Sequence, residues 1–252
     1  MMLSFCVLAS ALQGAAPPQR PITTPRQLLD AMHARYEGKW YRTLTFRQDN
    51  TQHHPDGTVE HSVWREWLQA PGRLRIEFQP PDSGNGVLFA NDSIYPFKAD
   101  SQMPAGRAFI HPLLVLGFDV YAQPVEHTQQ QLATRGFDLS VLSEATWEGR
   151  PVWVVGAKAG DARTRQFWVD KERLVFVRLL EPSRADTTKI TETRFNKYAP
   201  LEGGWVSPEV EFLVDGQQQF LEEYSEIKAN VAFPARLWDP RAWKAARGAS
   251  PR

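Results

Sequence analysis

The chain has 252 residues, and its 29 Lys plus Arg balance its 29 Asp plus Glu, so the formal net charge is zero. This balance argues against nucleic acid as a partner, because nucleic-acid binding needs a basic surface that displaces counterions. A single cysteine excludes a disulfide framework and a zinc site built on paired cysteines. The aromatic content of 12%, with 9 Trp and 14 Phe, favours strands that bury large side chains.

The N-terminal residues 1–16 have the composition of a signal peptide. Met1–Leu12 is apolar and is followed by small residues up to Ala16, so we predict cleavage near Ala16 and export to the periplasm. The Pro-rich residues 17–23 then form a linker. Phe5 precedes Cys6 where lipidation would need a small residue, so we predict no lipid anchor. No later apolar stretch approaches about 18 residues, and we expect no transmembrane span.

Residues 24–38 carry the signals of a helix. Thr24 can cap the helix with Gln27 completing a capping box, and Pro25 suits the first turn. An apolar stripe follows over 28–36, and Gly38 ends the helix. This pattern is typical of a helix that packs on a larger core.

From Lys39 the apolar period changes to two, which indicates strands. In the segment between Pro71 and Pro80, the apolar Leu74, Ile76 and Phe78 alternate with charged or polar residues. We therefore predict an antiparallel strand with one oily face and one charged face in water. Turn residues recur at about ten-residue spacing through this region, so residues 39–98 form a meander of hairpins.

Residues 99–136 interrupt the alternation. Apolar blocks at 107–118 and 125–135 predict two short helices, which would form a lid over the sheet. Alternating segments resume over 137–231, with an Asp170 turn between two of them. Residues 234–252 are rich in Arg and Ala, and we predict a flexible tail.

The fold class that follows is mainly β (α+β). We expect about ten or eleven strands in one curved antiparallel sheet, because an open sheet this wide must curl into an incomplete barrel. Short helices would plug its concave side. Residues 24–233 would form this single half-barrel domain.

No catalytic, metal or cofactor motif is present. There is no Gly-x-Ser-x-Gly elbow and no Walker loop. His53 and His54 could touch a metal, but without further ligands a solvated turn is the simpler interpretation. We therefore predict no enzyme; a secreted hydrolase, the third hypothesis, would need a clustered nucleophile and base.

Several motifs resemble one known family in their order and spacing. Pro71–Ile76, Gln79–Pro80, the Asp92 turn with Ile94–Phe97, and Gln166–Asp170 followed by 174–180 resemble the LolA/LolB group of bacterial lipoprotein carriers. The resemblance implies a half-open barrel with a helical lid and a cavity that takes acyl chains of lipids or lipoproteins. A membrane donor or acceptor protein would then be a partner.

This chain departs from the family pattern before the strand-initial Pro71. Where classical carriers have a basic residue and an inward aromatic, this chain has Ala70 and Leu74. A general lipid-binding role is therefore the expectation. The apolar residues expected to line the cavity lie on alternating strands: Leu44, Phe46, Leu74, Ile76, Phe78, Phe97, Phe167, Phe176 and Phe212.

Two alternatives remain open on the sequence alone. The same residues could form a closed core, because a packed core and a hollow one need the same alternation. The second functional hypothesis is a periplasmic sensor or adaptor that binds a protein partner through an edge strand or the 99–136 insertion.

Overall fold

The computed structural model describes residues 21–103 and 106–248, so the predicted signal peptide lies outside the described residues. The first half of the chain forms α1 (Pro25–Tyr36), β1 (Thr43–His53), β2 (Val59–Gln69), β3 (Arg73–Phe78), η1 (Pro81–Ser83), β4 (Gly86–Ala90), β5 (Ser93–Lys98), β6 (Ser101–Gln102), β7 (Arg107–Ala108), α2 (Pro112–Gly117), η2 (Asp119–Tyr121) and α3 (Val125–Thr134). The second half forms β8 (Leu142–Trp147), β9 (Arg150–Val155), β10 (Gln166–Asp170), β11 (Phe176–Pro182), β12 (Ile190–Asn196), β13 (Ala199–Leu201), β14 (Gly204–Val206), β15 (Glu209–Val214), β16 (Gln217–Ala229), η3 (Ala235–Trp238), η4 (Pro240–Ala242) and η5 (Lys244–Ala246).

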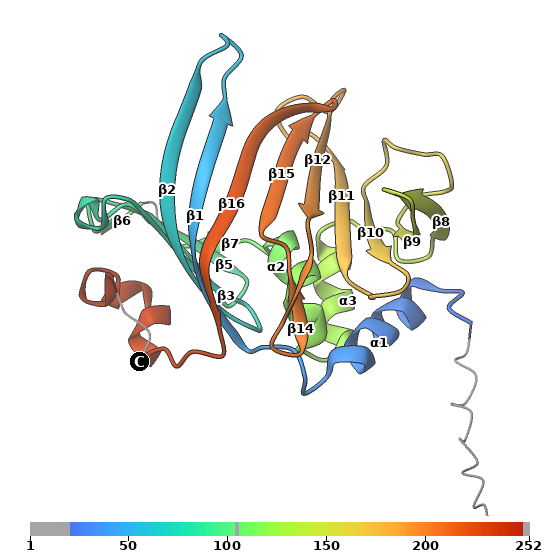
Figure 1. Ribbon diagram of the computed structural model, residues 1–252, viewed down its shortest axis with the longest axis horizontal. Helices are drawn as coiled ribbons and strands as arrows, with labels where there is room; N and C mark the ends of the chain where they lie inside the picture. The colour runs from blue at the N-terminus through green and yellow to red at the C-terminus, as the bar shows by residue number, and fades with distance from the viewer. Residues whose placement is uncertain (1–20, 104–105, 249–252) are drawn as a thin grey trace, which may run out of the picture.

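One curved antiparallel sheet dominates the described chain (Figure 1). It contains 14 strands in the order β6-β5-β4-β3-β2-β1-β16-β15-β12-β11-β10-β9-β8, with β7 paired to β5, while β13 and β14 form a separate pair. Within the described residues its ends, β6 and β8, do not pair with each other, so the sheet stays open. The predicted mainly β half-barrel is confirmed, with more strands than expected.

The sheet consists of two meanders that meet in the middle. Strand β1 pairs with β16 as well as with β2, from Leu44 opposite Ala229 to Gln52 opposite Phe220. The tight turn at Asn91–Asp92 between β4 and β5 has φ 52° at both residues, which matches the right-handed twist of a hairpin. The chain therefore returns at its end to complete the sheet beside its first strand.

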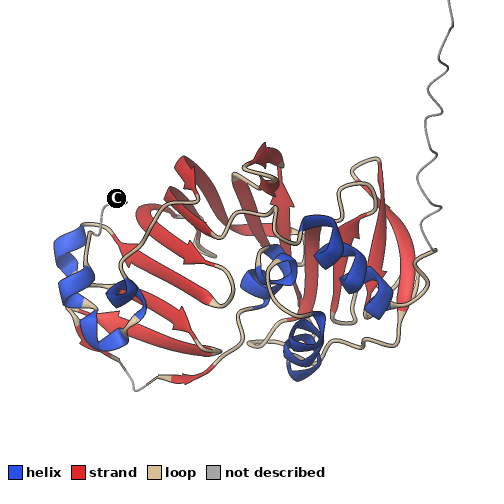
Figure 2. Ribbon diagram, turned by 90° about the horizontal axis from the view of Figure 1, so that it is seen from below, coloured by secondary structure: helices blue, strands red, loops and turns tan. Residues whose placement is uncertain are grey.

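Helix α1 begins with the predicted capping box. The Thr24 hydroxyl accepts a hydrogen bond from the Gln27 amide, and the Gln27 side chain accepts one from the Thr24 amide. Its stripe of Leu28, Leu29 and Met32 is fully buried. Together α1, α2 and α3 lie on one side of the curved sheet, which Figure 2 shows from below, and they pack on the main core.

The C-terminal segment is folded, and the prediction of a flexible tail is wrong for residues 234–248. Its three short helical turns cover the outer face of β2–β5 and form a second core there. The Trp243 ring stacks on Phe97 at a centroid distance of 4.2 Å. At Gly86 a Cβ atom would lie 2.8 Å from that indole, so glycine is needed for this close approach.

This cover also changes the predicted charged face of β3. Arg75 is 0% exposed and Glu77 is 2% exposed, although the alternation predicted that they would lie in water. Their ion pair of 2.7 Å lies under Trp243, whose carbonyl accepts a hydrogen bond from Arg75 at 2.8 Å. The outer face of this strand is therefore part of the interior.

Candidate functional site

A cavity of about 160 Å³ lies between helix α2 and the concave face of the sheet. Its walls come from six strands and from α2 with its flanking residues, and most of them are apolar. The lining residues are Phe46, Glu66, Leu68, Leu74, Ile76, His111, Leu113, Leu114, Phe118, Phe195, Val210, Phe212, Glu222 and Tyr224.

Four of the predicted lining residues reach this cavity. Phe46, Leu74 and Ile76 come from β1 and β3, and Phe212 comes from β15. They share a face because alternate residues of a strand point to the same side of the sheet. These four residues line a cavity on the concave side of the sheet, as predicted. Their contact with a lipid stays a prediction.

The other predicted residues lie elsewhere. Leu44, Phe167 and Phe176 are 0% exposed in the main core and do not line the cavity. Phe78 packs at 4.9 Å on Trp64, on the same face but beyond the cavity. Phe97 lies on the opposite face under Trp243, so its predicted place in the lining is wrong. Both faces of β5 carry apolar residues, so alternation gave no way to choose between them.

Helix α2 forms the wall opposite the sheet. It begins at Pro112, and the His111 ring accepts the Leu114 amide hydrogen at 3.3 Å as an N-cap. Burial, with the nearby positive charge of Arg135, lowers the pKa of His111 to about 4, so the ring is neutral at pH 7. Leu113 and Leu114 then project to the cavity from the predicted lid.

Partly exposed aromatic rings continue the apolar surface beyond the cavity. The Trp64 ring lies 4.9 Å from Phe78 and 5.7 Å from Phe220, and Phe220 lies 5.9 Å from Phe212. Since Phe212 also lines the cavity, the rings and the cavity form one continuous surface. We call Trp64, Phe78, Phe212 and Phe220 the aromatic rim.

Two carboxyl groups interrupt the apolar lining. Glu66 on β2 is 5% exposed, and Glu222 on β16 is half-buried and accepts a hydrogen bond of 2.6 Å from the Tyr224 hydroxyl. Burial and the charge of Glu222 raise the pKa of Glu66 well above its ordinary value. Burial raises the pKa of Glu222 to about 7, against the effect of the Tyr224 hydrogen bond.

The sequence predictions did not include these two carboxyls, although a signal for Glu66 was present. Glu66 stands between Trp64 and Leu68 at a spacing of two, so it shares their face. Because acidic residues in strands usually face water, alternation alone does not single out either glutamate as a cavity residue.

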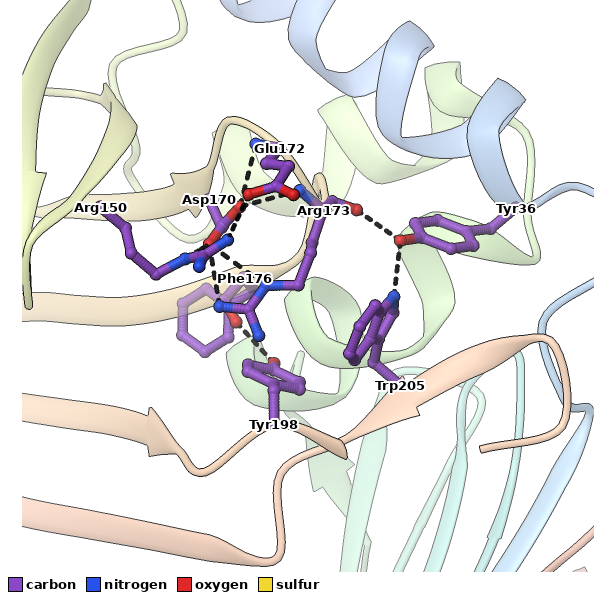
Figure 3. A network of polar contacts seen from close by, with 8 residues as sticks. All are labelled: Tyr36, Arg150, Asp170, Glu172, Arg173, Phe176, Tyr198 and Trp205. Atoms are coloured by element: carbon purple, nitrogen blue, oxygen red, sulfur yellow. Dashed lines mark hydrogen bonds and ion pairs between the residues drawn. The ribbon is translucent and has the colours of Figure 1, made fainter. Parts of the chain in front are cut away.

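A second polar cluster surrounds the Asp170 turn (Figure 3). The Asp170 carboxylate accepts hydrogen bonds from the Arg150 and Arg173 guanidinium groups at 2.6 and 3.0 Å and from the Arg173 amide at 2.8 Å. The Tyr36 hydroxyl of α1 donates to the Arg173 carbonyl and accepts a hydrogen bond of 3.0 Å from the Trp205 indole. These groups satisfy one another and fix the β10–β11 turn against α1, so the cluster is structural.

Over residues 21–103 and 106–248, no group of three or more His, Cys, Asp or Glu is arranged to hold a metal ion.

None of the helices in the described part of the chain is long and apolar enough to cross a membrane.

Comparison with known proteins shows a likeness in structure alone. No protein-family profile and no curated protein matches the sequence. A solved DUF1329 family protein from Desulfovibrio piger is 13% identical with a TM-score of 0.57, and the match covers 85% of this chain and 95% of that one.

Two further solved structures are similar to the same extent. A putative outer membrane lipoprotein-sorting protein domain from Vibrio parahaemolyticus is 14% identical with a TM-score of 0.56, covering 87% of this chain and 97% of that chain. A LolA superfamily protein from Nitrosomonas europaea is 12% identical with a TM-score of 0.53, covering 86% and 98%. The chain thus has a LolA-like fold, and the resemblance predicted from its motifs is confirmed at the level of the fold.

Proposed function

We propose that this protein is a periplasmic carrier that binds the hydrocarbon chain of a lipid or lipoprotein in the cavity beneath α2. The observation that carries the proposal is the hollow, mainly apolar space between α2 and the sheet. Each methylene group that enters such a space contributes about 0.8 kcal/mol. A chain too long for the cavity would continue over the aromatic rim.

The arrangement of α2 supports a carrier that both loads and releases. Helix α2 has 6 residues, and Leu113 on its cavity side is only partly buried. Such a short helix can move without breaking a hydrogen bond of the sheet, although its buried Leu114, Val115 and Leu116 must then leave the core. Displacement of α2 would open the cavity along its length.

The compartment and the cargo class are supported by the fold comparison. The similar Vibrio parahaemolyticus structure is described as a putative outer membrane lipoprotein-sorting protein domain, and this description supports lipid-modified proteins as candidate cargoes. We therefore extend the proposal to cargo that passes between the two membranes of a bacterium.

Native mass spectrometry tests this function. The protein, expressed in bacteria with its N-terminal segment and purified without detergent, is expected to carry lipid mass adducts that organic extraction removes. The extracted protein should then bind the uncharged fluorophore N-phenyl-1-naphthylamine. Absence of both adducts and fluorophore binding would contradict the proposal. A protein partner captured equally well after the cavity is filled by mutation would favour the adaptor alternative.

A further inference from the structure

Glu66 is a buried carboxyl that opens onto the cavity without a partner. It is 95% shielded, since only 5% of the residue is exposed, and it lines the space beneath α2. Its backbone carbonyl accepts a hydrogen bond from Thr45, but among residues 21–103 and 106–248 no side chain or amide contacts its carboxylate within hydrogen-bond distance. Buried polar groups are nearly always paired, so this one requires an explanation.

Other hydrogen-bond acceptors gather at the same place. Glu222 lines the cavity from β16, on the other side of β1, and its carboxylate accepts a hydrogen bond from the Tyr224 hydroxyl. Gln48 on the intervening β1 is 0% exposed, and its side-chain oxygen has no partner within the described chain. The Gln48 side chain also acts as a donor that lowers the pKa of Glu222, so within the described chain Glu66 is the cavity carboxyl that lacks a donor.

Among the described residues that line the cavity, none carries a positive charge that would compensate these carboxyls. The lining residues of β1, β3, β12 and β15 are apolar, and those of β2 and β16 add only the two glutamates and Tyr224 as ionisable groups. On the α2 side the one ionisable group is His111, whose ring is neutral. The cavity therefore presents two carboxyl groups that have no cation beside them among its lining residues.

We propose that the ligand is an amphiphile with a primary ammonium head group, held by Glu66 and Glu222, whose hydrocarbon chain lies along the apolar walls. This inference rests on the proposed lipid-binding function and adds the chemistry of the head group. A primary ammonium group has three donors, which match the two carboxylates and the Tyr224 oxygen. An anionic head such as a carboxylate or phosphate would instead disfavour the ionised forms of both carboxyls.

The ionisation of the two carboxyls adds a pH dependence. Burial disfavours the ionised form of each carboxyl: it raises the pKa of Glu66, where the charge of Glu222 adds to the effect, and it raises the pKa of Glu222 to about 7. An ammonium group would favour their ionised forms, so binding should strengthen as the pH rises from 5 to 8 while the amine stays charged. His111 becomes charged only near pH 4, below this range.

Calorimetric titration of the full-length protein with decylamine, decanol and decanoate tests the inference. At pH 7.5 decylamine is expected to bind at least tenfold more tightly than decanol, and decanoate more weakly than either. Decylamine affinity should fall about tenfold at pH 5, while decanol affinity stays constant. Lysophosphatidylethanolamine, compared with lysophosphatidylglycerol, shows whether the ammonium group belongs to a phospholipid or to a simple amine.

Two isosteric variants and a matched control complete the test. Glu66→Gln should abolish the preference for decylamine over decanol and leave decanol affinity unchanged, and Glu222→Gln should reduce that preference if Glu66→Gln does not fold. Glu60→Gln, at an exposed position of the same strand, should change nothing. Equal affinities for amine and alcohol, or a loss of both in Glu66→Gln, would overturn the ammonium head group. Failure of all three ligands to bind would overturn the lipid-binding function itself.

Discussion

Strands β2 and β3 bury charged groups on both of their faces, and the two faces treat them differently. On the outer face the Arg75–Glu77 pair is closed off by Trp243, with the guanidinium group 3.8 Å from the ring centroid. On the inner face Glu66 is almost as deeply buried but opens onto a cavity and has no cation beside it.

This difference suggests that the charged groups on the outer face stabilise the fold, whereas the carboxyl on the inner face serves binding. A buried charge with a partner holds a segment in place, whereas a buried charge that opens onto empty volume can be completed by a ligand. On the outer face that partner comes from the same chain, in the C-terminal segment. On the inner face we infer that it comes from outside. Substitutions on each face test this difference between a charge paired within the chain and a charge left for a ligand.

Removal of the cover on the outer face should have the largest effect. Trp243→Ala is expected to lower the free energy of unfolding by about 3–5 kcal/mol, because it leaves a large void and exposes a buried ion pair. Denaturation in guanidinium chloride measures the change. Met103→Ala, at an exposed position, provides the control. A loss below about 1 kcal/mol would show that the C-terminal segment is not part of the folded core.

Breaking the ion pair itself should cost somewhat less. Glu77→Gln leaves the Arg75 guanidinium group buried beside a neutral amide, and we expect a loss of about 3 kcal/mol in the free energy of unfolding. The double variant Arg75→Met, Glu77→Met removes both charges and should recover part of this loss. Urea denaturation of both variants measures the recovery; equal losses would mean that packing, and not the unpaired charge, dominates.

Asp119 is a buried carboxyl that is only partly paired. One of its oxygens accepts the Gly72 amide hydrogen at 2.9 Å, and the other has no partner within the described chain. Burial raises its pKa from 3.8 to about 7, and nearby Asp92 adds to this. A raised carboxyl pKa contributes stability below about pH 4, and this contribution is lost as the pH rises to 7.

In the variant Asp119→Asn the side chain does not ionise, so the pH-dependent loss of stability caused by Asp119 is absent. Its free energy of unfolding should therefore rise relative to the unmutated protein by about 2 kcal/mol between pH 5 and pH 7. Taking the difference between the two proteins cancels the opposite effect of His111, whose lowered pKa of about 4 destabilises the fold as the pH falls. Thermal or urea unfolding at the two pH values measures it, and a constant difference would show that Asp119 is ionised throughout.

Filling the inner cavity should have the smallest energetic effect and the clearest functional one. Leu113→Trp places an indole in the space beneath α2 and is expected to weaken N-phenyl-1-naphthylamine binding at least tenfold, which is about 1.4 kcal/mol. Fluorescence titration measures the affinity. Val59→Trp, at the exposed start of β2, introduces the same side chain outside the cavity and should bind normally. Equal affinities in both variants would place the fluorophore elsewhere.

Strand periodicity predicted more of this molecule than any single motif did. It placed Leu74 and Ile76 on the concave face and gave the curved antiparallel sheet, because local alternation sets which side chains share a face. The capping box at Thr24 gave the start of α1 for the same reason, since its residues are adjacent in sequence.

The rest depends on contacts between distant segments. Arg75 is buried by Trp243, which lies near the end of the chain. The sequence of β3 alone therefore does not predict this burial. The sequence does not determine the orientation of Phe97, because β5 is apolar on both faces. One face packs on the main core and the other on the second core. The void beneath α2 could not be predicted either, because a packed interior and a hollow one share the same pattern.

The pairing of β1 with β16 has a consequence for how the chain reaches its native state. The first strand of the sheet finds its second neighbour only when residues 217–229 are available, so the two meanders cannot be joined until almost the whole chain has been delivered. Such high contact order slows folding. Before that point the edge of β1 that faces β16 has no partner in the sheet.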